Sequence, residues 1–192
     1  MVVLTPQALP DIRMTVDEYL AADLPEGYRY ELVEGVVQMA PIPGLPHDSV
    51  VDRLNYVLTL YRVKRPDLIA HISQRFAVTL LDRQTAREPD FGVYGPGDLG
   101  DKKGKTWKAV TPILVVEVVS VGQEDRDYEE KRRDYWDAGV GEYWIADPVT
   151  KLLTVLTRGQ SDWVEAKFEQ NQSYRPKLLP GLEIKVEELF PS

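Results

Sequence analysis

The chain has 192 residues, which is long enough for one domain with a buried core and short for two. Hydrophobic residues make up 43% of it and charged residues 28%, an ordinary globular composition that argues against disorder. The formal net charge of −8 argues against a protein that coats nucleic acid through a broad basic face, although it leaves room for local contacts with a few phosphates.

The sequence has no candidate membrane segment, no secretory signal and no cysteine. No apolar run approaches the roughly 18 residues of a membrane span, and the N-terminus lacks the basic start and apolar stretch of a secretory signal. Cysteine is absent, which excludes disulfides, thiolate zinc sites and cysteine nucleophiles. We therefore expect a cytoplasmic protein with an N-terminal extension over residues 1–14 and a single domain over residues 15–192.

Hydrophobic periodicity and turn residues divide the chain into strands and helices. Thr15 is the expected N-cap of the first helix, with Glu18 completing a capping box. The turn residues Glu34 and Gly35 join the first two strands as a hairpin. In chain order, the predicted elements are a helix over 15–22, strands over 28–33 and 36–39, a helix over 48–62, strands over 68–73, 76–81, 91–94 and 112–119, a helix over 125–138, and strands over 142–146 and 152–156, followed by further short strands.

The centre of the chain indicates the fold class. The run from Ile113 to Val116 is apolar at consecutive positions, which predicts a strand covered on both faces. The helix after it ends at Gly139, a residue favoured just past a helix C-terminus, and the next strand follows at once. Such a unit has parallel strands and a right-handed crossover. We expect an α/β fold in which helices flank a mixed sheet, with additional antiparallel strands towards both ends of the chain.

Glu117 is the most informative residue for function because it interrupts this apolar strand. An unpaired carboxylate buried there would cost several kcal/mol or would be driven to protonate. A cationic side chain, a bound metal or a place at the wet rim of the sheet would relieve that cost. The choice between a functional carboxylate and a structural ion pair stays open at this point.

Asp90 strengthens the metal interpretation. Pro89 cannot donate to a β-ladder, so Pro89 and Asp90 mark the beginning of the strand over 91–94. One loop joins that strand to the Glu117 strand, which suits an antiparallel pair in which Asp90 and Glu117 lie at the same end. Two carboxylates there offer the oxygen ligands that Mg²⁺ and Mn²⁺ prefer. A turn aspartate that caps local backbone is the alternative.

Lys131 is the third candidate. Together with Tyr128, Tyr135 and Ala138 it forms a stripe at helical spacing that should face the sheet carrying Glu117. Its ammonium could hold a water molecule or a phosphate oxygen. A lysine paired with Asp127, one turn earlier, is the structural alternative.

Several segments together resemble the Uma family of bacterial endonuclease-like proteins, within the PD-(D/E)XK superfamily of restriction-endonuclease-like folds. The resemblance covers about residues 15–190, and the order and spacing of the segments make it specific although each is weak alone. The matching segments are YRYELVEG (28–35), His47 before the long helix, Pro89-Asp90, PILVVEVVS (112–120), the helix with Asp127, Lys131 and Tyr135, AGVGEYWIADP (138–148) and LPGLEIKVEELF (179–190).

The resemblance implies a metal-dependent nuclease site with one departure from the family pattern. The superfamily places lysine two residues after the glutamate, where this chain has Val119. Similar proteins are thought to draw that lysine from the neighbouring helix, which points to Lys131. The resemblance also implies an acidic ligand from the first hairpin, and we prefer Glu31, in a strand, over Glu34 at the turn. His47 could border the site and contact substrate.

A lysine-rich loop joins the two strands that carry Asp90 and Glu117. It contains Lys102, Lys103, Lys105 and Lys108 with Trp107 among them. Lys105 and Trp107 could contact a phosphate and stack on a base. A solvated hairpin tip explains the same composition.

Three hypotheses follow from the sequence. The first is an endonuclease that hydrolyses DNA phosphodiester bonds, with Asp90, Glu117 and Lys131 catalytic, Asp90, Glu117 and Glu31 holding Mg²⁺ or Mn²⁺, and a possible homodimer as its working form. The second is a catalytically inactive binding or regulatory protein of the same fold, which Val119 and the acidic charge favour. The third is a metal hydrolase for a small phosphorylated substrate.

Overall fold

The computed structural model describes residues 12–97, 110–120, 122 and 124–190. The strands are β1 (Tyr28–Val33), β2 (Val36–Pro41), β3 (His71–Ser73), β4 (Val78–Leu80), β5 (Thr85–Arg87), β6 (Phe91–Tyr94), β7 (Leu114–Val118), β8 (Glu142–Asp147), β9 (Leu152–Arg158), β10 (Trp163–Phe168), β11 (Ser173–Tyr174) and β12 (Ile184–Lys185). The helical segments are α1 (Val16–Leu20), α2 (Leu45–Lys64), a 3₁₀ turn (Leu81–Arg83), a π-helical turn (Arg126–Glu130), α3 (Lys131–Asp137) and α4 (Val186–Leu189).

Two sheets carry most of these strands. The larger sheet has the order β10-β9-β8-β7-β6-β3 and the smaller the order β2-β1-β5-β4, while β11 and β12 form a short pair of their own. In the larger sheet β7 and β8 run parallel, and the other paired neighbours are antiparallel. The sheet is therefore mixed, as the βαβ pattern around α3 predicts.

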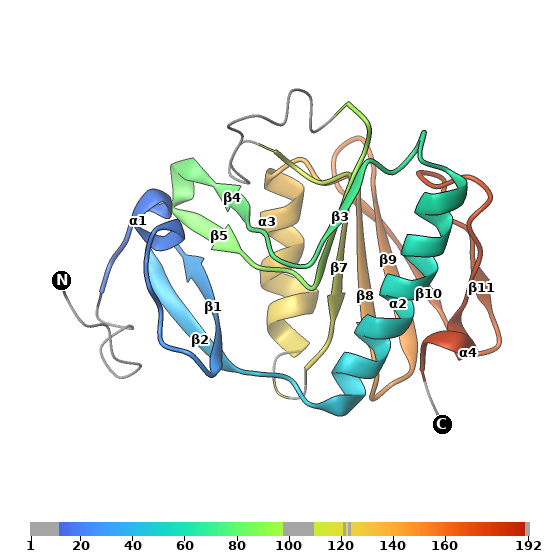
Figure 1. Ribbon diagram of the computed structural model, residues 1–192, viewed down its shortest axis with the longest axis horizontal. Coiled ribbons are helices and arrows are strands. Elements are labelled where there is room, and N and C mark those ends of the chain that lie inside the picture. Colours follow the sequence, from blue (N-terminus) through green and yellow to red (C-terminus); the bar gives the residue numbers. More distant parts are fainter. Residues whose placement is uncertain (1–11, 98–109, 121, 123, 191–192) are drawn as a thin grey trace.

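Helices cover both faces of the larger sheet. Leu54 and Leu58 of α2 pack with Val116 on one face, and Tyr135 of α3 packs with Val115 on the other. Figure 1 shows β7 and β8 between α3 and α2, with the smaller sheet and α1 on the far side of α3. Both faces of β7 are consequently dry, which accounts for its unbroken apolar sequence.

The hairpin and the first helix agree with the sequence. Thr15 caps α1 in a full capping box with Glu18. Glu34 and Gly35 both adopt left-handed backbone angles, with φ of +49° and +80°, the geometry of a tight turn that glycine favours. Gly139 follows α3 with φ of +86°, as expected of a residue that ends a helix.

Three local features differ from the predicted elements. Helix α2 begins at Leu45 rather than near Asp48, because Pro46 lies in the first turn, where a missing N–H costs nothing. Strand β5 was not expected, since its three residues are buried on both faces and leave no alternating pattern. The helix predicted over 125–138 begins as the π-helical turn Arg126–Glu130, where the amide of Lys131 bonds to the carbonyl of Arg126.

Candidate active site

Glu117 points from β7 to α3 and is 2% exposed. Its Oε1 accepts hydrogen bonds from Nζ of Lys131 at 2.7 Å and from the hydroxyl of Tyr135 at 2.5 Å. Lys131 and Tyr135 are four residues apart, so they lie on the same face of α3. One helix turn therefore supplies both partners of the carboxylate that interrupts the strand.

The ammonium of Lys131 is shared by three carboxylates. Besides Glu117, Nζ lies 3.1 Å from Oε1 of Glu31 and 3.0 Å from Oδ1 of Asp127. Burial alone would lower the pKa of Lys131, but Glu117, Glu31 and Asp127 outweigh it and raise that pKa above its ordinary value. Lys131 is thus a permanent cation, and both its predicted pairing with Asp127 and its contact with Glu117 are present.

Arg87 ties the smaller sheet to α3 from a fully buried position. Its Nη1 lies 3.0 Å from Oε2 of Glu31, and its Nε lies 2.7 Å from Oδ2 of Asp134. Burial opposes ionisation of Glu31, but Lys131, Arg126 and Arg87 lower its pKa to about 2. Glu31 is therefore an ionised carboxylate, held in place by Arg87 on one oxygen and facing Lys131 with the other.

Asp90 lies at the beginning of β6. The register pairs Phe91 with Val116, so Asp90 and Glu117 are the next residues at the same end of the two antiparallel strands. Oδ2 of Asp90 accepts the amide of Val118 at 2.8 Å. The expected convergence of the two strands is present.

A guanidinium and an imidazole flank Asp90. Nη1 of Arg29 donates to Oδ1 at 2.8 Å, and Nε2 of His47 lies 3.1 Å from Oδ2. Burial would raise the pKa of Asp90, but His47, Arg29 and the backbone amide bring it down to about 2. Burial likewise opposes protonation of His47, and the bond to Asp90 overcomes it and raises the imidazole pKa.

The carboxylates around Lys131 are incompletely compensated. Burial, followed by the neighbouring carboxylates Asp127, Asp90 and Glu31, raises the pKa of Glu117 to about 7 despite Lys131. Burial also raises the pKa of Asp127, although its ion pair with Lys131 opposes the rise. The cluster would accept additional positive charge.

A pocket of about 310 Å³ opens beside these residues. His47 and Arg29, the two partners of Asp90, line it together with Arg126. Val119, two residues after Glu117, also reaches it. The pocket therefore lies beside the end of the sheet that holds Asp90 and Glu117, which are themselves buried.

Comparisons with known proteins show the family and the fold of the chain. The sequence profile of the Uma2 family, described as "Putative restriction endonuclease", matches residues 16–187. The chain belongs to the Uma2 family. A crystal structure described as a "putative nuclease belonging to DUF820" from Anabaena variabilis superposes with a TM-score of 0.75 at 19% identity, covering 92% of this chain and 97% of that one. At this identity the superposition shows the shared fold. None of the curated proteins that were compared matches the chain.

Most of the site residues expected from the Uma2 pattern come together. Glu117, Lys131 and Glu31 are in direct contact, and His47 is bonded to Asp90. The alternative acid Glu34 lies at the exposed turn and faces Arg83 at 3.7 Å instead. Lys105 and Trp107 lie in 98–109, outside the described residues, and keep the status of a prediction.

Other contributors were not foreseen from the sequence. Arg87 lies on β5, a strand that was not predicted. Arg29 lies on β1 and Arg126 in the π-helical turn, and the sequence pattern of neither element indicates that these arginines point inward. Asp134 lies beside the predicted stripe of α3 and is nonetheless 2% exposed. Among the partners of Glu117, the sequence indicated Tyr135, because it lies one helix turn after Lys131 in the predicted stripe.

The carboxylates of the site are the type of ligand that a hard divalent cation prefers, but the described residues do not already form a metal-binding cluster. Within the described residues, no three histidine, aspartate or glutamate side chains are grouped as a metal cluster. Carboxylate oxygens such as those of Asp90 and Glu117, at one end of paired strands, are nevertheless the kind of ligand that Mg²⁺ or Mn²⁺ binds. Binding would require Arg29, His47 or Lys131 to give up part of their present contacts.

No helix within the described residues has both the length and the apolar character needed to cross a bilayer.

Proposed function

We propose that this Uma2 protein is a metal-dependent endonuclease that hydrolyses DNA phosphodiester bonds with Mg²⁺ or Mn²⁺. The observation that carries the proposal is the meeting of Glu117 of β7 with Lys131 of α3, 2.7 Å apart, at the end of the sheet that also holds Asp90. In this family a lysine beside such a carboxylate pair is expected. Helix α3 supplies one where the strand has Val119.

Asp90, Glu117 and Glu31 are the proposed ligands of the ion. A bound divalent cation would polarise the scissile phosphate and lower the pKa of the attacking water. Glu31 serves a second purpose, because its contact with Nζ fixes the Lys131 side chain. Arg87 in turn orients Glu31.

Lys131 acts as a fixed positive charge rather than as a base. Its raised pKa keeps it protonated at neutral pH, so it can donate hydrogen bonds but cannot accept a proton. We assign it two tasks: orienting the water and stabilising the negative charge that develops on the phosphate oxygens. Both require a preorganised ammonium, and three carboxylates hold this one in place.

The pocket beside the carboxylates supplies contacts to substrate. Arg29, His47 and Arg126 line it, and charge-assisted hydrogen bonds from such groups are suited to phosphate oxygens. These few contacts are compatible with the net charge of −8, since binding there does not need a basic surface.

Supercoiled plasmid tests the proposal directly. We expect the purified protein to nick or linearise it in Mg²⁺ or Mn²⁺ and to be inactive in chelator, with Glu117→Ala and Lys131→Ala inactive. Glu34→Ala, which changes an exposed turn carboxylate, is the matched control and should retain activity. Circular dichroism of each variant shows whether it is folded. Full cleavage by a folded Glu117→Ala would refute the assigned site.

A catalytically inactive binding or regulatory protein of the same fold is the second candidate. Val119 in the usual lysine position favours it, as do the ion pairs of Asp90 with Arg29 and His47, which occupy a proposed ligand. Folded wild-type protein that binds oligonucleotides but cleaves neither linear nor supercoiled DNA in either metal would support this candidate over the nuclease.

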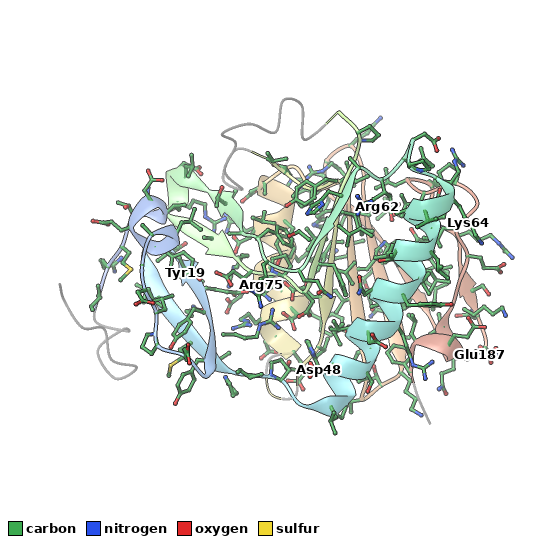
Figure 2. The ribbon with its side chains drawn as sticks, viewed as in Figure 1. Tyr19, Asp48, Arg62, Lys64, Arg75 and Glu187 are labelled. Atoms are coloured by element: carbon green, nitrogen blue, oxygen red, sulfur yellow. The ribbon has the colours of Figure 1, made fainter. Side chains whose placement is uncertain are left out.

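We also propose that the protein works as a homodimer that pairs through α2. Leu45, Tyr56 and Val63 are 80%, 64% and 74% exposed on its outer face, where they offer apolar side chains to a partner on either side of Asp52. Asp48 lies at one end of α2 and Lys64 at the other (Figure 2). Two antiparallel copies would bring the acidic end of each helix to the basic end of the other, as a two-fold interface requires.

A further inference from the structure

The pocket beside Asp90 and Glu117 has two chemically different parts. One wall is cationic, from Arg29, His47 and Arg126. The remainder is mostly apolar and comes from the end of β2, the segment that leads into the first turn of α2, and the turn after β8. Its apolar members are Ala40, Pro41, Ile42, Pro43, Pro46, Pro148 and Val149.

Four prolines make the apolar part rigid. Their rings fix φ near −65°, so Pro41, Pro43, Pro46 and Pro148 restrict the backbone that lines the pocket. Ile42 and Val149 are 61% and 69% exposed at the pocket. Exposed apolar side chains next to a charged wall are the signature of a binding site rather than of a core.

The size of the pocket limits what can enter it. A volume of about 310 Å³ is at the lower end of the range for small-molecule pockets, roughly 300–1,000 Å³. A duplex, whose two backbones stand on either side of a major groove about 12 Å wide, is too wide to enter a pocket of this volume. One nucleotide fits the chemistry, with its phosphate on the basic side chains and its base against the apolar ones.

We propose that this pocket binds one unpaired nucleotide next to the scissile phosphate, so that the preferred substrate is single-stranded DNA or a strand unpaired at the cut site. The proposal rests on the nuclease function proposed above and names its substrate class. Arg29 and His47 bring the phosphate to Asp90, to which both are bonded. Extruding a base from a duplex costs a few kcal/mol, which a strand that is already single does not pay.

Of the basic side chains in the pocket, Arg126 is the one best placed to form a new hydrogen bond with a ligand. Its Nε is buried without a hydrogen-bond partner among the described residues, and its nearest carboxylate, Glu31, is 3.9 Å away. A phosphate oxygen in the pocket would satisfy it. Arg133, on the same helical segment, is 79% exposed in its side chain and outside the pocket, which makes it the matched control.

Fluorescence anisotropy in chelator, where no cleavage occurs, tests the proposal. The probes are a labelled 12-nucleotide single strand and the same strand in a duplex. We expect at least about tenfold tighter binding of the single strand. The log–log slope of affinity against salt should be no steeper than about −2, since the pocket has at most three positively charged side chains and each contributes about 0.7. A duplex binder with six or more phosphate contacts would give about −5 or steeper.

Two pairs of variants locate the binding. Arg126→Gln and Val149→Glu should each weaken single-strand binding at least about tenfold. Arg133→Gln and Val164→Glu, the latter at an equally exposed valine of β10, should leave it unchanged. Equal affinity for duplex and single strand, or unchanged binding in both pocket variants, overturns the proposal.

The outcome is separable from that of the plasmid assay. Cleavage of plasmid without single-strand preference would leave the nuclease function standing and refute the nucleotide pocket. The opposite result is a single-strand preference that is lost in Arg126→Gln and Val149→Glu, with no cleavage in either metal. It would support the nucleotide pocket and refute the nuclease function.

Discussion

The ammonium of Lys131 on α3 lies 2.7 Å from Oε1 of Glu117 on β7, although the two residues come from different elements. A lysine two residues further along the strand, as in the superfamily pattern, would share the side of β7 on which Glu117 lies. Val119 occupies that position here, in the apolar cluster around Tyr135. Helix α3 therefore supplies the lysine that the superfamily pattern places on the strand.

Removing Lys131 should expose how strongly the carboxylates depend on it. Lys131→Met leaves Glu117, Glu31 and Asp127 buried without their shared cation, at a cost of about 3–5 kcal/mol in the free energy of unfolding. Urea denaturation measures that cost, and the exposed Arg133→Met is the control.

Mn²⁺ should partly rescue Lys131→Met. A divalent cation bound to the native carboxylates stabilises the folded state by mass action. We therefore expect Mn²⁺ to raise the Tm of Lys131→Met by more than that of wild type. An identical shift in the two proteins would argue that the ion does not bind near these carboxylates.

Tyr135 offers a milder test of the same contact. Tyr135→Phe deletes the hydroxyl that donates to Glu117 and keeps the ring, so we expect a loss of about 1.5–3 kcal/mol, typical of a bond to a charged group. Tyr143→Phe is the matched control, because Tyr143 donates to the backbone carbonyl of Asp127, and a neutral bond contributes about 1 kcal/mol. Chemical denaturation measures both. Equal losses would indicate that Glu117 is not charged in the native state.

The α2 interface predicts a dimer that one exposed substitution breaks. Tyr56→Glu places a second acidic group one turn after Asp52 and removes the central apolar side chain, and we expect it to shift the protein from dimer to monomer in analytical ultracentrifugation. Val164→Glu, on an equally exposed valine of β10, should leave the dimer intact. A wild type that is monomeric at about 100 µM would rule the interface out.

Glu142 provides a pH test at the opposite end of the sheet from Asp90. It is 1% exposed, accepts bonds from Trp144 and Tyr174, and burial raises its pKa above the ordinary 4.5. Between the unfolded and folded pKa the native state retains a proton that the unfolded state releases, so stability falls as pH rises above about 4.5. Glu142→Gln removes this loss and keeps an oxygen acceptor.

The measurement is the Tm of wild type and Glu142→Gln from pH 4 to pH 8. The advantage of the variant should grow with pH above about 4.5 and level off once native Glu142 has ionised. An advantage that is constant across this range would show that the carboxyl has the same pKa in both states.

Much of the fold was predictable because it rests on local patterns. The apolar run before Glu117, the Gly139 stop and the strand after it determine a βαβ unit, and Pro89 marks where β6 begins. Those same patterns place Asp90 and Glu117 at one end of paired strands. The stripe through Lys131 then follows from helical periodicity alone.

The remainder of the site depends on how the smaller sheet docks against α3, which no local pattern encodes. Arg87 and Arg29 become site residues only because β5 lies against α3 and β1 brings Arg29 to Asp90. The π-helical turn is equally hidden, since Tyr128 and Lys131 keep an ordinary helical spacing across its end. Residue type did not distinguish Arg126, which lines the pocket, from exposed Arg133.

Calorimetric titration with Mn²⁺ tests most directly whether Asp90 and Glu117 share a cation. We predict one binding event per chain in wild type and in Glu34→Gln, and at least about tenfold weaker binding in Asp90→Asn and in Glu117→Gln. Undiminished affinity in both folded site variants, or no binding in wild type, would contradict the account.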